Sequence, residues 1–274
     1  MTSSPALRRF DFDDDEALDS VEVPAAVVCA RCGRPDCPGC EPIDETTLPS
    51  GVISIVPWER PGQSAWTRLW ATARSATRSA PQFFQSLPPG ETAPALLYAV
   101  VSELCAVSSW ALTLAAILAA LAPDVALRLL MNGQGQTILM RVFLVATFGF
   151  TTVLVVGHVV YGFALDVGVQ RVGGRSHRSQ ALRYGLYTTG WDILTSPLGF
   201  VVSLFAEGPK ATLALVPLSV EVPGRAATAF LRGIYRLEEP QLGRARRYGT
   251  MVAVAVSVAA AFVVLALLMV SIIV

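Results

Sequence analysis

Four cysteines near the N-terminus have the spacing of metal ligands. Residues 29 to 40 read Cys-Ala-Arg-Cys-Gly-Arg-Pro-Asp-Cys-Pro-Gly-Cys, which makes two Cys-x-x-Cys pairs, Cys29/Cys32 and Cys37/Cys40. Four thiolates close a tetrahedral zinc site that leaves no coordination position open for a substrate. A stretch this short has no apolar core, so a bound metal must supply its folding free energy. The pattern therefore predicts a structural zinc knuckle.

Other chemistry for these thiols stays open. The four residues between the two pairs are fewer than many zinc ribbons have, and cross-braced fingers such as FYVE domains need outer ligands that this chain lacks. An iron–sulfur site or reactive thiols without a metal are the alternatives. A reducing cytoplasm disfavours structural disulfides.

Five ionisable residues lie within or near the ends of apolar segments. A charge in the bilayer centre costs several kcal/mol unless it is paired or faces water, so such residues are functional candidates by default. Interface positions and ion pairs, such as Glu221 with Arg225 four residues on, are the alternative explanation. The candidates are Glu103, His158, Asp166, Asp192 and Glu221.

Constellations typical of catalysis are missing from the sequence. There are two histidines, no nucleophile-elbow serine and no phosphate-binding glycine loop. The 21 basic and 21 acidic residues give a net charge of zero, which disfavours a nucleic-acid partner. We expect a protein that is not an enzyme.

The elements that hold these residues are predicted to be membrane helices. The chain is 53% hydrophobic and 15% charged, against about 25% charged in an ordinary soluble domain. The sequence predicts an all-α, polytopic membrane bundle of about five transmembrane helices, at residues 96–121, 142–169, 186–206, 211–231 and 251–274.

The arginines predict an orientation for these spans. Thirteen arginines flank alternate spans on one side, whereas the other side has Arg128, Arg141 and Lys210. Because cytoplasmic loops carry the excess of basic residues, the N-terminus is expected in the cytoplasm and the C-terminus outside. The thirteen are Arg60, Arg68, Arg74, Arg78, Arg171, Arg175, Arg178, Arg183, Arg232, Arg236, Arg244, Arg246 and Arg247.

Three segments precede the membrane domain, which we place at residues 65–274. Residues 1–28 are acidic and poor in large apolar side chains, so a disordered tail is expected; residues 29–40 are the zinc knuckle and residues 41–64 a linker. Residues 65–86 predict an amphipathic helix with Trp66 and Trp70 on one face. This face could lie at the membrane interface, with Arg68, Arg74 and Arg78 toward lipid phosphates, or could pack on the bundle or a partner.

The membrane domain resembles the Yip family of Ypt/Rab-interacting membrane proteins, in its prokaryotic form. The resemblance covers residues 65 to 274 and rests on soft motifs in register with five spans. The Asp-Leu-Tyr-Gly-Pro motif of eukaryotic members has no counterpart here, so their Rab-binding role is not carried over. The motifs are Pro81-Gln82-Phe83-Phe84, Arg171-Val172-Gly173-Gly174, the Tyr-rich stretch 184–187, Pro197-Leu198-Gly199 and Leu231-Arg232-Gly233-Ile234-Tyr235.

What the resemblance implies is a five-span helical domain with a cytoplasmic N-terminus and no catalytic residues. The preference for Arg over Lys points to a GC-rich bacterium and hence to the bacterial inner membrane. We expect a membrane scaffold or adaptor whose zinc knuckle and acidic tail dock an unknown protein. A homo-oligomer is a possible assembly. The alternatives are a small transporter that uses the intramembrane acids and a zinc- or redox-responsive membrane sensor.

Overall fold

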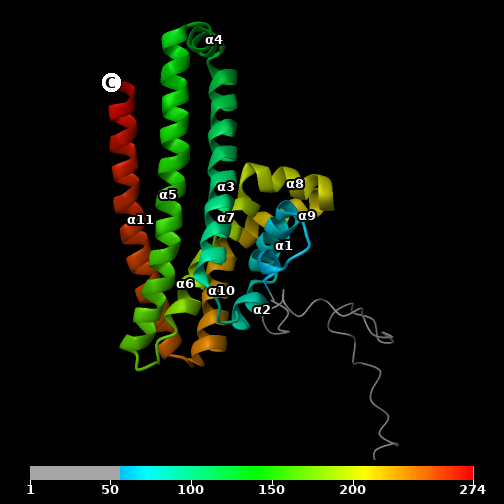
Figure 1. Ribbon diagram of the computed structural model, residues 1–274, viewed down its shortest axis with the longest axis vertical. Coiled ribbons are helices and arrows are strands. Elements are labelled where there is room, and N and C mark those ends of the chain that lie inside the picture. Colours follow the sequence, from blue (N-terminus) through cyan, green and yellow to red (C-terminus); the bar gives the residue numbers. More distant parts are fainter. Residues whose placement is uncertain (1–55, 274) are drawn as a thin grey trace, which may run out of the picture. The chain divides into compact units, whose positions relative to one another are not determined.

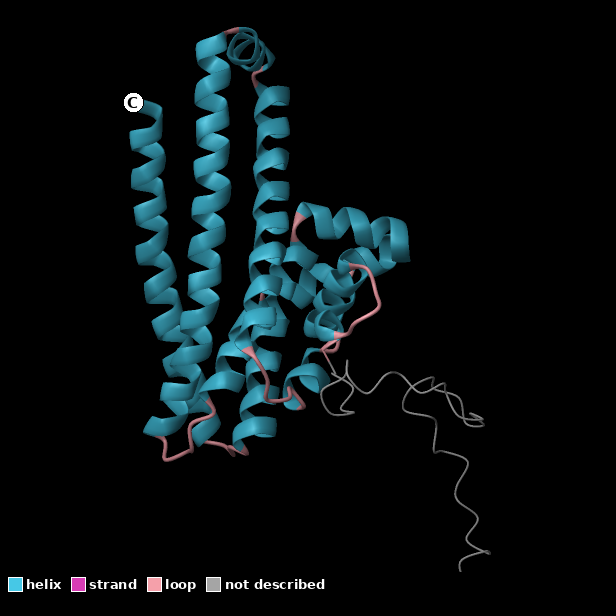
Figure 2. Ribbon diagram, viewed as in Figure 1, coloured by secondary structure: helices cyan, strands magenta, loops and turns pink. Residues whose placement is uncertain are grey.

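The computed structural model describes residues 56–273, and every regular element in that range is a helix (Figure 1, Figure 2). The cysteine knuckle, the acidic tail and most of the expected linker lie outside the described residues. A 3₁₀ helix, Pro57–Glu59, comes first. It is followed by α1 (Ala65–Arg78), α2 (Ala80–Gln85), α3 (Thr92–Leu121), α4 (Pro123–Met131), α5 (Gly133–Arg171), α6 (Arg178–Thr188), α7 (Gly190–Thr195), α8 (Pro197–Glu207), α9 (Pro209–Leu213), α10 (Leu215–Tyr235) and α11 (Gln241–Ile273).

Three of these helices, α3, α5 and α11, are long and apolar enough to cross a membrane. They coincide with the first, second and fifth expected spans. α5 packs against both α3 and α11, and the three run beside one another (Figure 1). Large apolar side chains such as Leu118, Met140 and Phe262 are about two-thirds exposed on them. An apolar surface of this extent is suited to lipid rather than to water.

The burial pattern of α3 divides this helix into two halves. Its buried residues all lie between Ala95 and Ala106, and the half from Val107 to Leu121 has none within the described part of the chain. At 1.5 Å per residue, Glu103 lies about 27 Å along the axis from Leu121. That length is close to the ~30 Å hydrocarbon thickness of a bilayer. If Leu121 lies at one face of the bilayer, Glu103 is near the other.

Aromatic packing organises the opposite end of the unit. The Tyr184 ring of α6 stacks on Phe230 of α10 with centroids 4.3 Å apart, and Phe84 of α2 approaches Tyr184 edge-on at 4.8 Å. The indole N–H of Trp191 in α7 donates to the Ala76 carbonyl of α1 at 2.8 Å. These contacts join five helices from both halves of the chain, α1, α2, α6, α7 and α10, into one core.

Of the roughly five spans expected, the described residues offer three candidates, or up to four. Residues 186–206 are covered by α6, α7 and α8, and the pair α6–α7 with α8 bends by 71° at Ser196, which makes a broken span or a re-entrant segment. Pro197 begins α8 there, because a proline cannot continue the preceding helix.

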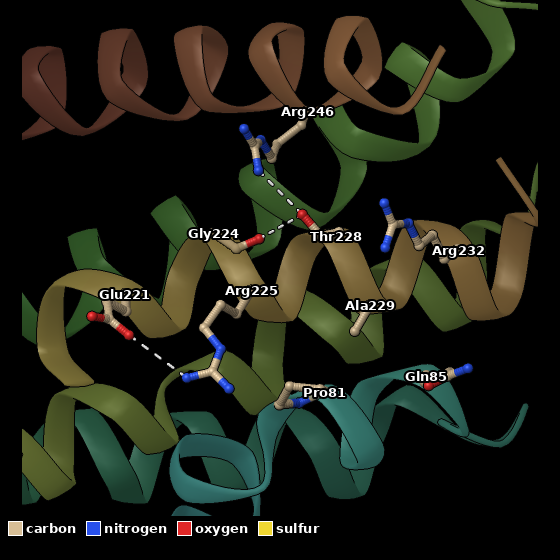
Figure 3. A pocket seen from close by; sticks show the side chains of 9 residues that line it. All are labelled: Pro81, Gln85, Glu221, Gly224, Arg225, Thr228, Ala229, Arg232 and Arg246. Carbon is tan, nitrogen blue, oxygen red and sulfur yellow. Dashed lines mark hydrogen bonds and ion pairs between the residues drawn. The ribbon is translucent and has the colours of Figure 1, made fainter. Parts of the chain in front are cut away.

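The fourth expected span, residues 211–231, is also not a candidate. It is divided between α9 and α10, which carries Pro217 and Pro223. Three charged residues, Glu221, Arg225 and Arg232, lie along α10 and are exposed beside α2 (Figure 3). Its apolar residues Phe230 and Leu231 are buried against protein instead of lipid.

The amphipathic helix expected at residues 65–86 forms as α1 and α2. Leu69, Trp70 and Ala73 are buried in the helical core, whereas Trp66 is half-exposed. Of the two alternatives, packing on the bundle thus holds for Trp70. A membrane-surface position for Trp66 stays a prediction.

A buried ion pair fixes the 3₁₀ helix to α6. Arg183 is 1% exposed, and its Nη2 donates to Glu59 Oε1 at 2.6 Å; the Tyr187 hydroxyl donates to the same oxygen at 2.5 Å. Removing one partner of a buried pair leaves the other charge uncompensated, which costs far more than the net worth of the pair.

We therefore predict that Arg183→Met lowers the free energy of unfolding by about 3–5 kcal/mol. Thermal unfolding of the detergent-solubilised full chain measures this loss. Arg175→Met is the matched control, because Arg175 is exposed on the loop before α6. Equal losses in the two variants would contradict a special role for the buried pair.

Candidate functional site

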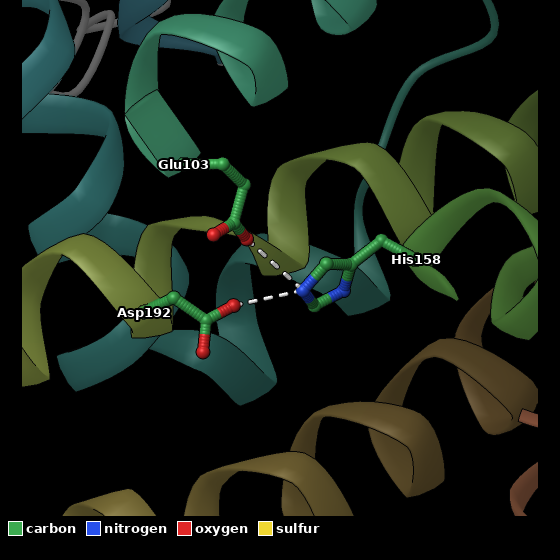
Figure 4. A group of neighbouring side chains, drawn as sticks. All are labelled: Glu103, His158 and Asp192. Carbon is green, nitrogen blue, oxygen red and sulfur yellow. Dashed lines mark hydrogen bonds and ion pairs between the residues drawn. The ribbon is translucent and has the colours of Figure 1, made fainter. Parts of the chain in front are cut away.

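Three of the five ionisable candidates meet at one point in the structure. Glu103 comes from α3, His158 from α5 and Asp192 from α7, and the two carboxylates converge on the imidazole of His158 (Figure 4). His158 Nε2 lies 2.8 Å from Asp192 Oδ2 and 3.3 Å from Glu103 Oε1. We call these three residues the acid–histidine cluster.

Close backbone contact between α5 and α6 brings the cluster together. A Cβ atom on Gly185 would lie 2.2 Å from the carbonyl oxygen of His158, and one on Gly162 would lie 2.2 Å from that of Ala181. No side chain fits at either place, so the two helices approach at facing glycines. α7 follows α6 directly after Thr189, which places Asp192 beside His158.

The second ring nitrogen of His158 is held by Thr188. Nδ1 lies 2.7 Å from Thr188 Oγ1, and this hydroxyl donates its own hydrogen to the Gly185 carbonyl at 2.5 Å. Nδ1 must therefore be the donor in its contact with Thr188. Nε2 then either donates a proton to Asp192 or binds a metal ion in place of that proton.

Glu103 is the most deeply placed member of the cluster. Its side chain is 0% exposed, and neither carboxylate oxygen has a hydrogen-bond partner among the described residues; its contact with His158 is an ion pair. A neighbouring α3 residue, Ser102, donates to the Thr189 carbonyl at 3.0 Å and so fixes α3 against the α6–α7 junction. A buried carboxylate without hydrogen bonds is costly unless a cation satisfies it or it takes up a proton.

The cluster has the donor atoms and spacing of a metal site. One ligand atom from each residue lies within 4.8 Å of the others. Tetrahedral zinc at about 2.0–2.1 Å from nitrogen and oxygen would hold its ligand atoms about 3.3 Å apart. The Nε2–Oε1 distance of 3.3 Å already has this value. The 2.8 Å distance to Asp192 must widen by about 0.5 Å, which the half-exposed Asp192 side chain allows.

Thr188 would act as an outer-shell partner of such a metal. Histidine ligands generally donate their other ring N–H to a neighbouring acceptor, which fixes the tautomer and the ring plane. The Nδ1–H to Oγ1 contact is that arrangement. Sequence reasoning missed Thr188 and Ser102, because a hydroxyl in a helix gives no signal until the neighbouring helix is known.

Asp166, the fourth candidate, belongs to a separate hydrogen-bond network. It accepts from Gln170, Ser176, the backbone N–H of His177 and the Tyr235 hydroxyl, at 2.7 to 2.9 Å. Burial, and then this bond to Asp166, raise the pKa of Tyr235 above its ordinary value, so Tyr235 keeps its proton and remains a donor. Four donors on one carboxylate indicate a structural tie between α5, the following loop and α10.

Glu221, the fifth candidate, lies apart on α10. Its carboxylate is 3.6 Å from Arg225 four residues later, and both side chains are more than half exposed. This is the helical ion pair that the sequence offered as an alternative to function.

The arginines expected at the membrane interface have partners in the protein. Arg74 and Arg78 both pair with Glu207 at the end of α8. Arg68 donates to the Trp58 carbonyl at 3.0 Å and lies over the Trp58 ring. Their contact with lipid stays a prediction.

Comparison with protein-family models, with curated proteins and with solved structures finds no match for this chain. The resemblance to the Yip family therefore remains a prediction. The zinc knuckle at Cys29, Cys32, Cys37 and Cys40 lies outside the described residues and is likewise a prediction.

A single methyl group tests the close contact that assembles the cluster. Gly185→Ala places a Cβ atom where the His158 carbonyl lies, so α6 must move away from α5. We expect the free energy of unfolding to fall by about 3 kcal/mol, the upper part of the range for overpacked cores. Thermal unfolding in detergent measures it. In the control Gly133→Ala, the added Cβ atom meets nothing within 4 Å. A Gly185→Ala protein as stable as this control would show that the helices are not in contact.

Proposed function

We propose that this chain is an integral membrane protein that binds one divalent transition-metal ion at Glu103, His158 and Asp192 and responds to it. The observation that carries the proposal is the convergence of two carboxylates on one imidazole whose other nitrogen is already fixed by Thr188. Each ligand comes from a different helix, so bound metal ties α3, α5 and α7 together. A change in metal occupancy would change how firmly these helices are joined.

A divalent ion balances the charge of this cluster. With one proton on Nε2, the imidazolium and two carboxylates carry a net charge of −1. A divalent ion on a neutral imidazole and two carboxylates brings the sum to zero, as a second proton on Glu103 also would. A neutral site costs much less free energy in a low-dielectric environment.

The donor set narrows the class of metal. Imidazole nitrogen suits zinc, iron, nickel and copper, whereas carboxylate oxygen also suits magnesium and manganese. One nitrogen and two oxygens point to borderline ions such as Zn²⁺, Fe²⁺ or Mn²⁺. Three protein ligands leave a further coordination position for water.

The position of the cluster favours a responsive site over a channel. Asp192 is 40% exposed, which gives an ion access to the cluster. In the direction of α4, residues 104–121 of α3 and 142–157 of α5 contain no charged side chain. A cation that continued through this part would meet no counter-charge along these two helices.

The cysteine segment extends the same proposal. If the N-terminus is cytoplasmic, as the arginines predict, a zinc knuckle at residues 29–40 would present a docking surface there. The chain would then combine the scaffold and sensor roles expected from its sequence. This part rests on the sequence pattern alone.

Metal binding to the full chain tests the proposal once the cysteines are removed as competitors. With all four knuckle cysteines changed to serine, one Zn²⁺ or Mn²⁺ per chain should remain bound, and metal at 100 times its Kd should stabilise the fold by about 2.7 kcal/mol. His158→Ala and Glu103→Gln should lose both effects. Without metal, Glu103→Gln should unfold at the same or a higher temperature than the parent, because it removes a buried charge.

His177→Ala is the control for this experiment, because His177 is exposed on the loop before α6. It should bind metal as the parent does. Full metal binding by His158→Ala, or loss of binding by His177→Ala, would contradict the assignment.

A transporter is the second candidate, and the break between α7 and α8 beside Asp192 favours it. Transporters commonly bind ions at such discontinuous helices. In liposomes that contain the purified chain, we expect no uptake of Mn²⁺ above that of protein-free liposomes. Uptake that is lost in Asp192→Asn would favour the transporter over the responsive site.

A further inference from the structure

A basic pocket lies between α2, α10 and α11. It has a volume of about 690 Å³ and is lined by Arg225, Arg232 and Arg246 together with one acid, Glu221. α10 runs between α11 and α2, and Arg246 projects from α11 toward α10, where it donates to Thr228 at 3.1 Å (Figure 3). None of these residues belongs to the acid–histidine cluster.

The charge of this pocket is not balanced within the protein. Arg225 is 3.6 Å from Glu221, and Arg232 is 4.0 Å from Glu239, with all four side chains more than half exposed. Exposed pairs of this length contribute little and exchange readily for a better acceptor. Three guanidinium groups against two carboxylates, Glu221 and Glu239, leave one positive charge in excess, which makes the pocket a site for an anion. Arginine is the side chain best suited to phosphate oxygens.

An apolar slot continues from the basic pocket. A second pocket of about 370 Å³ shares Gly224 and Arg246 with the first, so the two are contiguous. Its other lining residues come from α5, α10 and α11, and most are apolar or small, such as Leu154, Gly157, Ala253 and Val254. His158, which also lines it, is the residue that this slot shares with the acid–histidine cluster.

The slot follows one face of α11 away from the arginines. Arg246, Thr250, Ala253 and Val254 are spaced i, i+4, i+7 and i+8, which puts them on the same side of the helix. Val254 lies eight positions after Arg246, which is about 12 Å along the axis. Beyond Arg247 the helix has no charged residue. The slot therefore starts among arginines and ends in the apolar part of the helix.

We propose that this pair of pockets binds one anionic phospholipid. The phosphate is held by Arg225 and Arg246, with Arg232 at the rim, and an acyl chain lies in the slot between α5, α10 and α11. A basic site next to helices suited to the bilayer is the usual arrangement for anionic headgroups. The largely apolar continuation matches an acyl chain, which a free phosphate ion does not have.

Binding of phosphatidylglycerol to the full chain in detergent tests this inference. Native mass spectrometry and thermal-shift titration give the affinity for phosphatidylglycerol, with phosphatidylcholine of the same acyl chains for comparison. The double variant R225Q/R246Q should weaken phosphatidylglycerol binding by about 30-fold. The matched double variant R244Q/R247Q removes the same charge from exposed positions that do not line the pocket, and should change binding less than two-fold.

A second arm separates the lipid from free phosphate and remains informative if R225Q/R246Q fails to fold. Ala253→Trp fills the slot and leaves the arginines in place, so it should also weaken phosphatidylglycerol binding, and 10 mM inorganic phosphate should not compete. Competition by phosphate, with no effect of Ala253→Trp, would make the pocket a plain phosphate site. Equal loss in R244Q/R247Q, or equal binding of phosphatidylcholine, would overturn the inference as nonspecific adsorption.

Discussion

The backbone contact between α5 and α6 at Gly162 and Gly185 is the constraint on which the functional site depends. Because neither position accepts a Cβ atom, the two helices meet at the closest distance that backbones allow. The contact sets the position of Thr188 on His158 and, through the short α7, that of Asp192. α5 also extends along α3 and α11. One helix thus connects the compact core with the part suited to the bilayer.

The two buried acids show two ways of holding a carboxylate in an apolar setting. Asp166 accepts four hydrogen bonds and needs no cation. Glu103 accepts none among the described residues and faces the ring nitrogen of His158. The hydrogen bonds of Asp166 satisfy its carboxylate, whereas the carboxylate of Glu103 still needs a positive charge. This difference, more than the presence of acids in apolar helices, separates a structural carboxylate from a candidate ligand.

The sequence predicted much of the fold and part of the site. Long uncharged stretches identified α3, α5 and α11, because helices of that length and composition are suited to span a bilayer. It failed at residues 186–231, where hydropathy cannot distinguish a helix covered by lipid from one covered by protein. Phe230 and Leu231 are as apolar as the residues of any span, but both are buried in the protein, and the Tyr184 ring of α6 stacks on Phe230.

The sequence predicted which residues could form the site, but not which of them lie close together in the fold. Glu103, His158, Asp192, Asp166 and Glu221 all stood out for the same reason, an ionisable group in an apolar segment. Their separation into one cluster and two structural pairings required the crossing of α3, α5 and α7. Helix breaks at Thr189 and Ser196 determine the position of Asp192. The one sign of these breaks in the sequence is Pro197, which follows Ser196.

Two of the proposed metal ligands, Glu103 and His158, lie on long helices that are suited to the bilayer. The far ends of α3 and α5 are joined through α4, about 27 Å from Glu103 along the axis. Membrane helices tilt to match the thickness of the hydrocarbon around them. A change of about 5° in the angle between α3 and α5, pivoting at α4, would move the two side chains by about 2 Å relative to each other, enough to break a coordination bond. If the cluster binds metal as proposed, the thickness of the surrounding membrane would change its metal affinity.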